Sequence, residues 1–501
     1  MKAQDSLDII NEIEAKLPVD QWVIDDIHIW PVVRIHIFSL LRDLSLQSTG
    51  QKSERKISMP KYPRLAFGYM KGFLRYARAF FADLRHNAVP SSADVIFLGD
   101  QVSRILIHGK WYDKLCEPII DYLEKRRGMR CFHMDPGHKY RIPRHNRSMF
   151  IQANLDKELI RSAFIYRENE FVKGLSQEYG IVLEMLRSRC KDINPPSLIS
   201  ISKNVSYIRS AAEFFGRVLR RVNPSLAFLV EYYGQTGLAF NLACRRYGIR
   251  TVEIPHGNHG NVHVAYSRWN KLPERGYELL PSIFWCWSDA EANMITKWSN
   301  NYSEWHKPIV GGNPWLNIWK CENNEMIRSY DEKIVEIKNS SSSQVHVLCT
   351  YEFDYEDLLK IIKESPNSWF WWIRVHPCRL GQREQIRRLL KRKKIVNCDL
   401  DNATDMPLYA LLKRVDVHLT EYSSTVIESE SFCVPSVITR KAGADAFSRQ
   451  VESGWAVAVY TIEEIVKGLE YQIKRKPALP VTYGAMEKCD LSIIDSLLAL
   501  F

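Results

Sequence analysis

The sequence predicts an α/β protein with two successive units, each a parallel sheet covered by helices, and a helical region in front of them. Short apolar runs alternate with segments of helical spacing from about residue 91 onward. This alternation stops at a run of small polar residues, 339–343, and then starts again. The first 50 residues lack the alternation, and residues 33–44 have helical spacing.

The first α/β unit is expected to span residues 91–335. Apolar runs at residues 95–98, 226–230, 251–254, 283–287 and 309–310 are typical of strands buried on both faces of a parallel sheet. A helical pattern over residues 236–247 ends at Gly248, a residue type that commonly ends helices. The order strand, helix, strand predicts a Rossmann-like arrangement.

The second α/β unit is expected to span residues 344–475, after a linker of sequence Asn-Ser-Ser-Ser-Ser at 339–343. Strands are predicted at residues 345–349, 369–375, 415–419 and 436–439, and helices at 384–394 and 425–431. Residues 476–501 remain as a C-terminal tail or helix. Two such units joined by a linker make a cleft, and open parallel sheets bind ligands at the carboxyl ends of their strands.

The N-terminal region divides into a helical cap, residues 1–50, and a basic amphipathic connector, residues 51–90. Residues 51–86 contain nine lysines and arginines against two acidic residues, with aromatic residues between them, whereas the whole chain has a net charge of +11. This pattern predicts contact with an anionic membrane surface. Packing of the aromatic face on a neighbouring domain and nucleic-acid binding are the alternatives.

The chain has no uninterrupted apolar run of the roughly 20 residues that a membrane-spanning helix needs. Its polar, acidic start does not resemble a secretory signal. The eleven cysteines lie singly along the chain, without metal-ligand spacing, and therefore predict reduced thiols and no zinc site. We expect a cytoplasmic protein, peripheral at the inner face of the plasma membrane.

Polar side chains follow two of the strands predicted in the second unit. A strand, a turn of serines and threonine and a helix start together predict an anion site, because backbone N–H groups and hydroxyls point at it. Basic side chains at the end of the neighbouring strand would meet a phosphate. The residues expected to bind a nucleotide sugar are Arg374, His376, Pro377, Glu421, Ser423, Ser424, Thr425 and Glu428.

Several of these motifs resemble those of known families. Thr420-Glu421-Tyr422-Ser423-Ser424 resembles the T-D-Y-S-S signature of bacterial CDP-glycerol polyol-phosphate transferases of wall teichoic acid synthesis, with Glu in place of Asp. Arg374-Val375-His376-Pro377 resembles the H-P motif of bacterial sialyltransferases and capsule Kdo transferases, which use CMP-sugars. Gly311-Gly312-Asn313-Pro314 resembles the G-N-P turn of capsule-type members, and Pro255-His256-Gly257 resembles their Q-H-G, with Pro in place of Gln.

The resemblance covers about residues 225–440 and implies the GT-B fold of surface-polysaccharide transferases, with two Rossmann-like lobes. It implies metal-independent chemistry without a cofactor, with the nucleotide on the second lobe and the acceptor on the first. By position in the motifs, His376, Ser423 and Ser424 would contact the donor phosphate. Glu428 would hold the ribose.

The first unit offers two candidate catalytic residues, and the sequence leaves the choice between them open. Glu231 ends one predicted strand and His256 ends the next, so both are expected at the carboxyl edge of the sheet. Either could act as general base toward an acceptor hydroxyl. We expect Glu231 if the donor is a CMP-sugar and His256 if it is a CDP-polyol. No metal is expected at His256, His259 and His263.

The expected function is transfer of a sugar from a nucleotide-sugar donor, with a CMP-linked acidic sugar such as Kdo or sialic acid favoured, to a capsule, lipopolysaccharide or O-antigen glycan. Polyol-phosphate transfer from CDP-glycerol or CDP-ribitol is the enzymatic alternative. A non-catalytic membrane-surface or nucleic-acid-binding protein is the alternative of another class, and we expect no nucleic acid. The absence of G-x-G-x-x-G and P-loop motifs argues against dinucleotide enzymes and NTPases.

Overall fold

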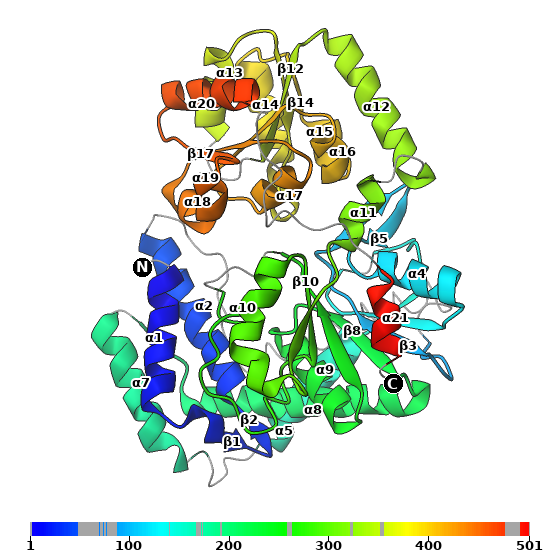
Figure 1. Cartoon of the computed structure of the whole chain (residues 1–501), viewed down its shortest axis with the longest axis vertical. Helices are drawn as coiled ribbons and strands as arrows, with labels where there is room; N and C mark the ends of the chain where they lie inside the picture. The colour runs from blue at the N-terminus through cyan, green and yellow to red at the C-terminus, as the bar shows by residue number, and fades with distance from the viewer. Residues whose placement is uncertain are drawn as a thin grey trace. The chain divides into compact units, whose positions relative to one another are not determined.

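The computed structural model describes residues 3–48, 70, 74, 77, 88–139, 141–166, 172, 174–190, 193–257, 263–320, 324–350, 355–475 and 491–499. The chain divides into two compact units (Figure 1). The first contains Met1–Arg104, Trp111–Gly311 and Asp490–Phe501, and the second contains Ile105–Lys110 and Gly312–Cys489. Most of the basic connector and His259 lie outside the described residues.

The first unit is built on a seven-stranded sheet in the order β11-β10-β9-β8-β3-β6-β7, in which every described pairing is parallel. Its middle strands are buried along their whole length, because helices cover both faces of a parallel sheet. The strands are β3 (Val95–Leu98), β6 (Cys131–Asp135), β7 (Ser148–Phe150), β8 (Leu226–Val230), β9 (Arg250–Ile254), β10 (Ile283–Cys286) and β11 (Lys307–Val310).

The helices of the first unit include the predicted N-terminal helical region. The helices are α1 (Ala3–Lys16), α2 (Trp30–Ser48), α4 (Glu117–Arg127), α5 (Gln152–Ile165), α7 (Ser176–Arg189), α8 (Leu198–Val222), α9 (Gln235–Arg246), α10 (Asp289–Ser299) and α21 (Ile493–Leu498). Short pieces complete the unit: η1 (Val19–Gln21), η3 (Asn300–Tyr302) and the two-stranded sheet of β1 (Val23–Ile24) with β2 (Ile27–His28). A further two-stranded sheet, of β4 (Arg104–Ile107) with β5 (Lys110–Asp113), has residues in both units, because Ile105–Lys110 belong to the second.

The N-terminal helices share one hydrophobic core with the rest of the first unit. A fully buried ion pair joins Arg34 of α2 to Glu14 of α1. Arg34 also donates to the backbone carbonyls of Val264 and Ser267, and Glu14 accepts the N–H of Asn270. Because these bonds satisfy both buried charges, the helical region is held as part of the first unit.

The second unit is built on a six-stranded parallel sheet in the order β14-β13-β12-β15-β16-β17. Its strands are β12 (Val345–Thr350), β13 (Trp369–Ile373), β14 (Cys398–Asp399), β15 (Val417–Thr420), β16 (Ser436–Ile438) and β17 (Ala456–Ala458). Its helices are α11 (Pro314–Lys320), α12 (Glu325–Ser341), α13 (Tyr355–Glu364), η4 (Pro377–Gln382), α14 (Arg383–Arg392), α15 (Asp401–Asp405), α16 (Leu408–Leu412), α17 (Thr425–Ser431), α18 (Lys441–Ala446), α19 (Ser448–Glu452) and α20 (Ile462–Arg475). The predicted α/β class with two parallel sheets is confirmed.

The predicted linker at residues 339–343 is wrong. Residues 339–341 form the last turn of α12, which ends at Ser341 and is followed by the capping residue Ser342 with a φ of +52°. Two of the serines stay helical because their hydroxyls donate back to carbonyls of the preceding turn, Ser340 to Ile337 at 2.9 Å and Ser341 to Lys338 at 2.8 Å. A run of serines therefore marks a helix end here.

The described α-helices range in length from five residues in α15 to 25 residues in α8. None of these helices combines the length and the apolar character needed to cross a bilayer.

The second sheet contains a histidine that is neutral in the folded protein. His418 of β15 is fully buried, and its ring nitrogens lie 2.8 Å from Thr350 Oγ1 and 3.0 Å from Ser436 Oγ. Burial lowers the pKa of His418 from its ordinary value of 6.5 to about 3. In the unfolded chain the ring regains its ordinary pKa, so the unfolded state binds more protons between these two values.

His418 should therefore make stability depend on pH. Its contribution is complete above about pH 6.5 and is lost as the pH falls toward about 3, by about 1.4 kcal/mol per pH unit. The free energy of unfolding, measured with urea between pH 7 and pH 4, should show this slope. In His418→Gln the slope should be smaller by the amount that one proton contributes, about 1.4 kcal/mol per pH unit. The exposed His138→Gln is the control that keeps the wild-type slope. An equal slope in His418→Gln and wild type would show that His418 does not titrate on unfolding.

Candidate active site

The carboxyl edge of the second sheet gathers three of the predicted charged residues. Arg374 and His376 follow β13, and Glu428 lies in the first turn of α17, which follows β15. β12 lies between these two parallel strands, so both strands end at the same edge. Burial lowers the pKa of Arg374 and that of His376. The charge of Glu428 opposes this effect at Arg374, and the charges of Arg379 and Arg374 add to it at His376, so the three groups interact electrostatically.

Arg374 is held by the backbone of its own unit. Its Nη1 donates to the carbonyls of Ala403 at 2.7 Å and Met406 at 2.5 Å. Burial lowers its pKa to about 10, against the opposing effect of Glu428 and Asp405. The guanidinium is therefore still charged at neutral pH and fixed in direction, so it supplies a stationary positive charge to the edge of the sheet.

His376 is the more accessible of the two cationic candidates. Its side chain is exposed, while Pro377 begins η4. Partial burial of the imidazole, followed by the charges of Arg379 and Arg374, lowers the pKa of His376. The ring is thus neutral at pH 7 and able to hydrogen-bond an oxygen of a ligand at this edge.

In the turn before α17, two side chains stabilise the turn and a third faces outward. Ser423 Oγ lies 2.9 Å from Thr425 Oγ1 and accepts the N–H of Thr425 at 3.3 Å, so both side chains stabilise the turn. Thr425 is buried, whereas Ser424 is exposed. Within the described residues the hydroxyl of Ser424 has no hydrogen-bond partner. Ser424 is therefore the hydroxyl of this turn best placed to reach a ligand.

The side chain of Glu421 does not lie with those of the other predicted site residues. Its side chain is fully buried, and its Oε1 accepts a hydrogen bond from Arg440 Nε at 3.1 Å, just after β16. Gly443 packs against the backbone of the same residue, since a Cβ on Gly443 would lie 2.2 Å from Glu421 O. The structure thus places Glu421 beneath the turn, where its carboxylate joins β15 to the segment that follows β16.

Two residues missed as site residues hold Glu428 in place. Tyr409 is buried, and the pKa of its hydroxyl is raised well above 10 by burial and by the charge of Glu428, to which the hydroxyl donates. Asn313 Nδ2 donates to Tyr409 Oη at 3.3 Å. Asn313 also accepts the N–H groups of Trp315 and Leu316 at the start of α11, so its amide is fixed. Only the Gly-Asn-Pro motif pointed to Asn313, and nothing in the sequence pointed to Tyr409.

The carboxyl edge of the first sheet gathers a second polar group. Glu231 and His256 follow the adjacent strands β8 and β9, and Asp100 follows β3 on the other side of β8. His256 is exposed, and its Nε2 lies 3.2 Å from the hydroxyl of Tyr233. Glu231 is half-buried, with a φ of +56°. The structure brings both predicted catalytic residues to this edge.

Asp100 adds a carboxylate that the sequence did not assign to the site. Burial, then the charge of Asp113, raises the pKa of Asp100, and the N–H of Ser103 and the charge of His256 oppose this. Ser103 N–H donates to Asp100 Oδ1 at 2.5 Å, which fixes the carboxylate. His256 therefore has the hydroxyl of Tyr233 and the carboxyl group of Asp100 in its surroundings, and the hydroxyl can orient its ring.

No protein family matches the sequence, and no curated protein matches it either. Solved structures with a similar chain path include UDP-GlcNAc 2-epimerases. The one from Neisseria meningitidis, bound to UDP-GlcNAc, is 14% identical, with a TM-score of 0.46 over 81% of this chain and 100% of that chain. The one from Methanocaldococcus jannaschii is 13% identical, with a TM-score of 0.47 over 81% of this chain and 99% of that chain.

The wall teichoic acid polymerase TagF is also similar in structure. It is 11% identical, with a TM-score of 0.45 over 87% of this chain and 96% of that chain. At such identities and TM-scores the function has to be argued from the residues of this chain itself.

Tyr409→Phe should destabilise the second unit. The change removes a buried hydroxyl that accepts from the Asn313 amide and faces Glu428, which costs about 1–3 kcal/mol. Tyr460→Phe, which removes the hydroxyl of an exposed tyrosine, should change stability by less than about 0.5 kcal/mol. Urea unfolding followed by tryptophan fluorescence measures both. Equal stability of the two variants would show that the Tyr409 hydroxyl holds neither neighbour.

Proposed function

We propose that this chain is a metal-independent glycosyltransferase of the GT-B type that transfers a sugar from a nucleotide-sugar donor to a bacterial surface glycan. The observation that carries the proposal is the meeting of Arg374, His376 and Glu428 at one carboxyl edge, beside the outward hydroxyl of Ser424. A nucleotide sugar needs donors for its phosphate oxygens, a positive charge near the phosphate and an acceptor for its ribose hydroxyls. This edge offers two donors, a fixed guanidinium and a carboxylate.

The proposed role of this edge is to bind the donor and stabilise its leaving phosphate. Ser424 and neutral His376 would donate hydrogen bonds to phosphate oxygens, and Glu428 would accept from the ribose. Arg374 would contribute its charge from a fixed position. Charge develops on the phosphate as the bond to the sugar breaks, and groups already oriented toward it stabilise that charge without reorganisation.

The proposed general base is His256 of the first unit. The acceptor hydroxyl would lose its proton to the imidazole as its oxygen bonds to the anomeric carbon, while the bond from that carbon to the phosphate oxygen breaks. The nucleotide leaves with the bonding electron pair. Asp100 would stabilise the imidazolium, and Tyr233 would hold the ring. This environment supports His256 as the base for either donor class, in place of the expectation that a CMP-sugar donor would use Glu231.

A CMP-linked acidic sugar such as Kdo or sialic acid is the favoured donor, because the Arg-Val-His-Pro sequence resembles the motif of enzymes that use CMP-sugars. Polyol-phosphate transfer from CDP-glycerol or CDP-ribitol is the second candidate. It is favoured by the surroundings of His256 and by the Thr-Glu-Tyr-Ser-Ser sequence. In both cases we propose that residues 51–86 hold the enzyme to the anionic inner face of the plasma membrane, close to a lipid-linked acceptor of capsule, lipopolysaccharide or O-antigen synthesis.

Nucleotide binding can be tested by thermal shift with CMP, CDP, UDP, UDP-sugars and GDP. A cytidine nucleotide should stabilise the protein, by about 2.7 kcal/mol at a hundredfold excess over its Kd. Ser424→Ala and His376→Ala should lose the effect. Ser188→Ala and His138→Ala, at exposed positions of the first unit, are matched controls that should retain it. If no nucleotide stabilises the folded wild type, the non-catalytic binding protein becomes the better interpretation.

The general base can be tested with slow hydrolysis of CMP-sialic acid, CMP-Kdo and CDP-glycerol, in which water replaces the acceptor. His256→Ala should lower the rate about 10²–10⁴-fold with little change in KM, because a base acts on the chemical step. Glu231→Gln should retain most of the rate. The opposite pattern would assign the base to Glu231. The preferred donor among the three distinguishes sugar transfer from polyol-phosphate transfer.

A further inference from the structure

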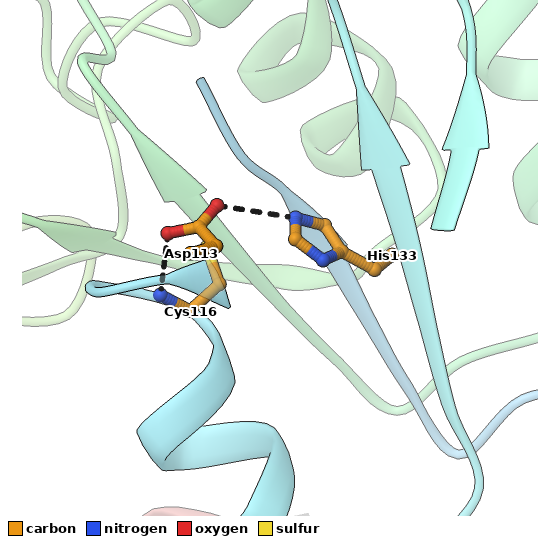
Figure 2. Close-up of side chains that lie close together, drawn as sticks. All are labelled: Asp113, Cys116 and His133. Atoms are coloured by element: carbon orange, nitrogen blue, oxygen red, sulfur yellow. Dashed lines mark hydrogen bonds and ion pairs between the residues drawn. The ribbon is translucent and has the colours of Figure 1, made fainter. Parts of the chain in front are cut away.

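A buried group of three different side chains lies within the first unit, apart from the proposed donor site. Figure 2 shows Asp113 at the end of β5, Cys116 at the start of α4 and His133 within β6. Asp113 and Cys116 are 0% exposed and His133 is 1% exposed. One potential ligand atom from each lies within 4.8 Å of the other two. A carboxylate oxygen, a thiol sulfur and an imidazole nitrogen thus converge from three elements.

We propose that Asp113, Cys116 and His133 bind one zinc ion. Zinc is the divalent metal that takes oxygen, nitrogen and sulfur ligands together, usually in a tetrahedral arrangement. Cys116 would bind as thiolate and release its proton to solvent. Three protein ligands leave the fourth position for a water molecule or for the carboxylate of Asp100, on which the charge of Asp113 acts.

The hydrogen bonds of the group support this proposal. Asp113 Oδ1 accepts the backbone N–H groups of Leu115 at 3.0 Å and Cys116 at 3.1 Å, so the carboxylate is fixed. Within the described residues, neither Asp113 Oδ2 nor the ring nitrogens of His133 make a hydrogen bond. The nearest approach is an ion-pair distance of 3.5 Å between Asp113 Oδ2 and His133 Nε2. Such buried polar atoms are uncommon unless a water or an ion satisfies them.

Gly99, just after β3, leaves room beside these atoms. A Cβ at Gly99 would lie 2.5 Å from His133 Nε2 and 2.7 Å from Asp113 Oδ2. The missing side chain therefore leaves a point near both ligand atoms, at distances not far from the roughly 2.0–2.2 Å of zinc to nitrogen and oxygen. A larger residue at position 99 would occupy that point.

Acidic and basic side chains surround the group of three residues. Four carboxylates lie together, those of Asp100, Asp113, Glu117 and Asp135. Two guanidiniums accompany them: Arg104 lies 2.9 Å from Asp135 and 3.5 Å from Glu117, and Arg144 lies 3.1 Å from Asp135. Burial raises the pKa of Glu117 to about 9, so this carboxyl is neutral at pH 7, and the charges alone do not require a cation. The case for the ion is the geometry of Asp113, Cys116 and His133.

The ion would be structural and would join three elements at the carboxyl edge of the first sheet. β5, α4 and β6 would be tied together next to Asp100, whose carboxylate neighbours His256. The proposal goes beyond the proposed transferase activity, in which no metal takes part. Each can fail without the other, because zinc content and nucleotide binding are measured separately.

The test is the zinc content of the purified full-length protein after incubation with zinc chloride and removal of unbound metal. Wild type should retain one zinc ion per chain. Cys116→Ser and Asp113→Asn, which keep the shape of the side chains, and Gly99→Ala should retain almost none. Cys244→Ser is the matched control, since it alters a buried thiol of α9 and should retain one ion. Circular dichroism confirms that each variant is folded.

Cobalt provides a second readout that does not depend on the folding of a variant. Wild type loaded with Co²⁺ should show the visible bands of a tetrahedral ion and a near-ultraviolet thiolate-to-cobalt band. Zinc should displace both. Absence of stoichiometric zinc in the wild type, or equal zinc in folded Cys116→Ser and wild type, would overturn the proposal. Cobalt bands without the thiolate band would remove Cys116 from the site and overturn the ligand set proposed.

Discussion

Burial on both faces is the constraint on which both sheets depend. Helices cover the two faces of a parallel sheet, so its middle strands are apolar along their length, and polar side chains that act on a ligand have to lie beyond the strand ends. β3, β8 and β13 are fully buried, and Asp100, Glu231 and Arg374 follow them directly or within two residues. The positions of both candidate clusters are therefore consequences of how the sheets are covered.

The two edges differ in how their side chains are held. In the second unit Glu428 is held by Tyr409, Tyr409 by Asn313, and Arg374 by two carbonyls, so the charged groups have fixed directions before any ligand binds. Ser424 and His376 remain exposed. This division suits a nucleotide site, because preorganised charges favour a developing negative charge while the exposed groups exchange water for phosphate oxygens.

The sequence predicted five of the seven strands of the first sheet and four of the six strands of the second, and it predicted part of the site. Short, fully apolar runs bounded by turn residues, such as residues 95–98 and 226–230, indicate buried strands. The structure has strands at those residues. The region between residues 99 and 150 gave no such signal, since β5 and β6 carry charged and polar residues at buried positions. Periodicity cannot reveal a strand whose buried residues are paired charges, because the pairing is a property of the fold.

The same limit applies to the individual residues of the sites. Motifs pointed to His376 and Ser424, but the pairing of Glu421 with Arg440 and the bond from Tyr409 to Glu428 join residues 19 positions apart in each case. The proposed zinc ligands have the same character: Asp113 and Cys116 are neighbours, yet His133 joins them only through the pairing of β3 with β6. Spacing rules find metal sites built on one hairpin or helix, whereas these three residues come from β5, α4 and β6, and Gly99 after β3 leaves room beside His133 and Asp113. The same folding step brings several carboxyls together with the guanidiniums of Arg104 and Arg144. Burial raises the pKa of Glu117 to about 9, so a proton held on this carboxyl helps to balance the buried charges, and this balance depends on contacts that the sequence does not reveal.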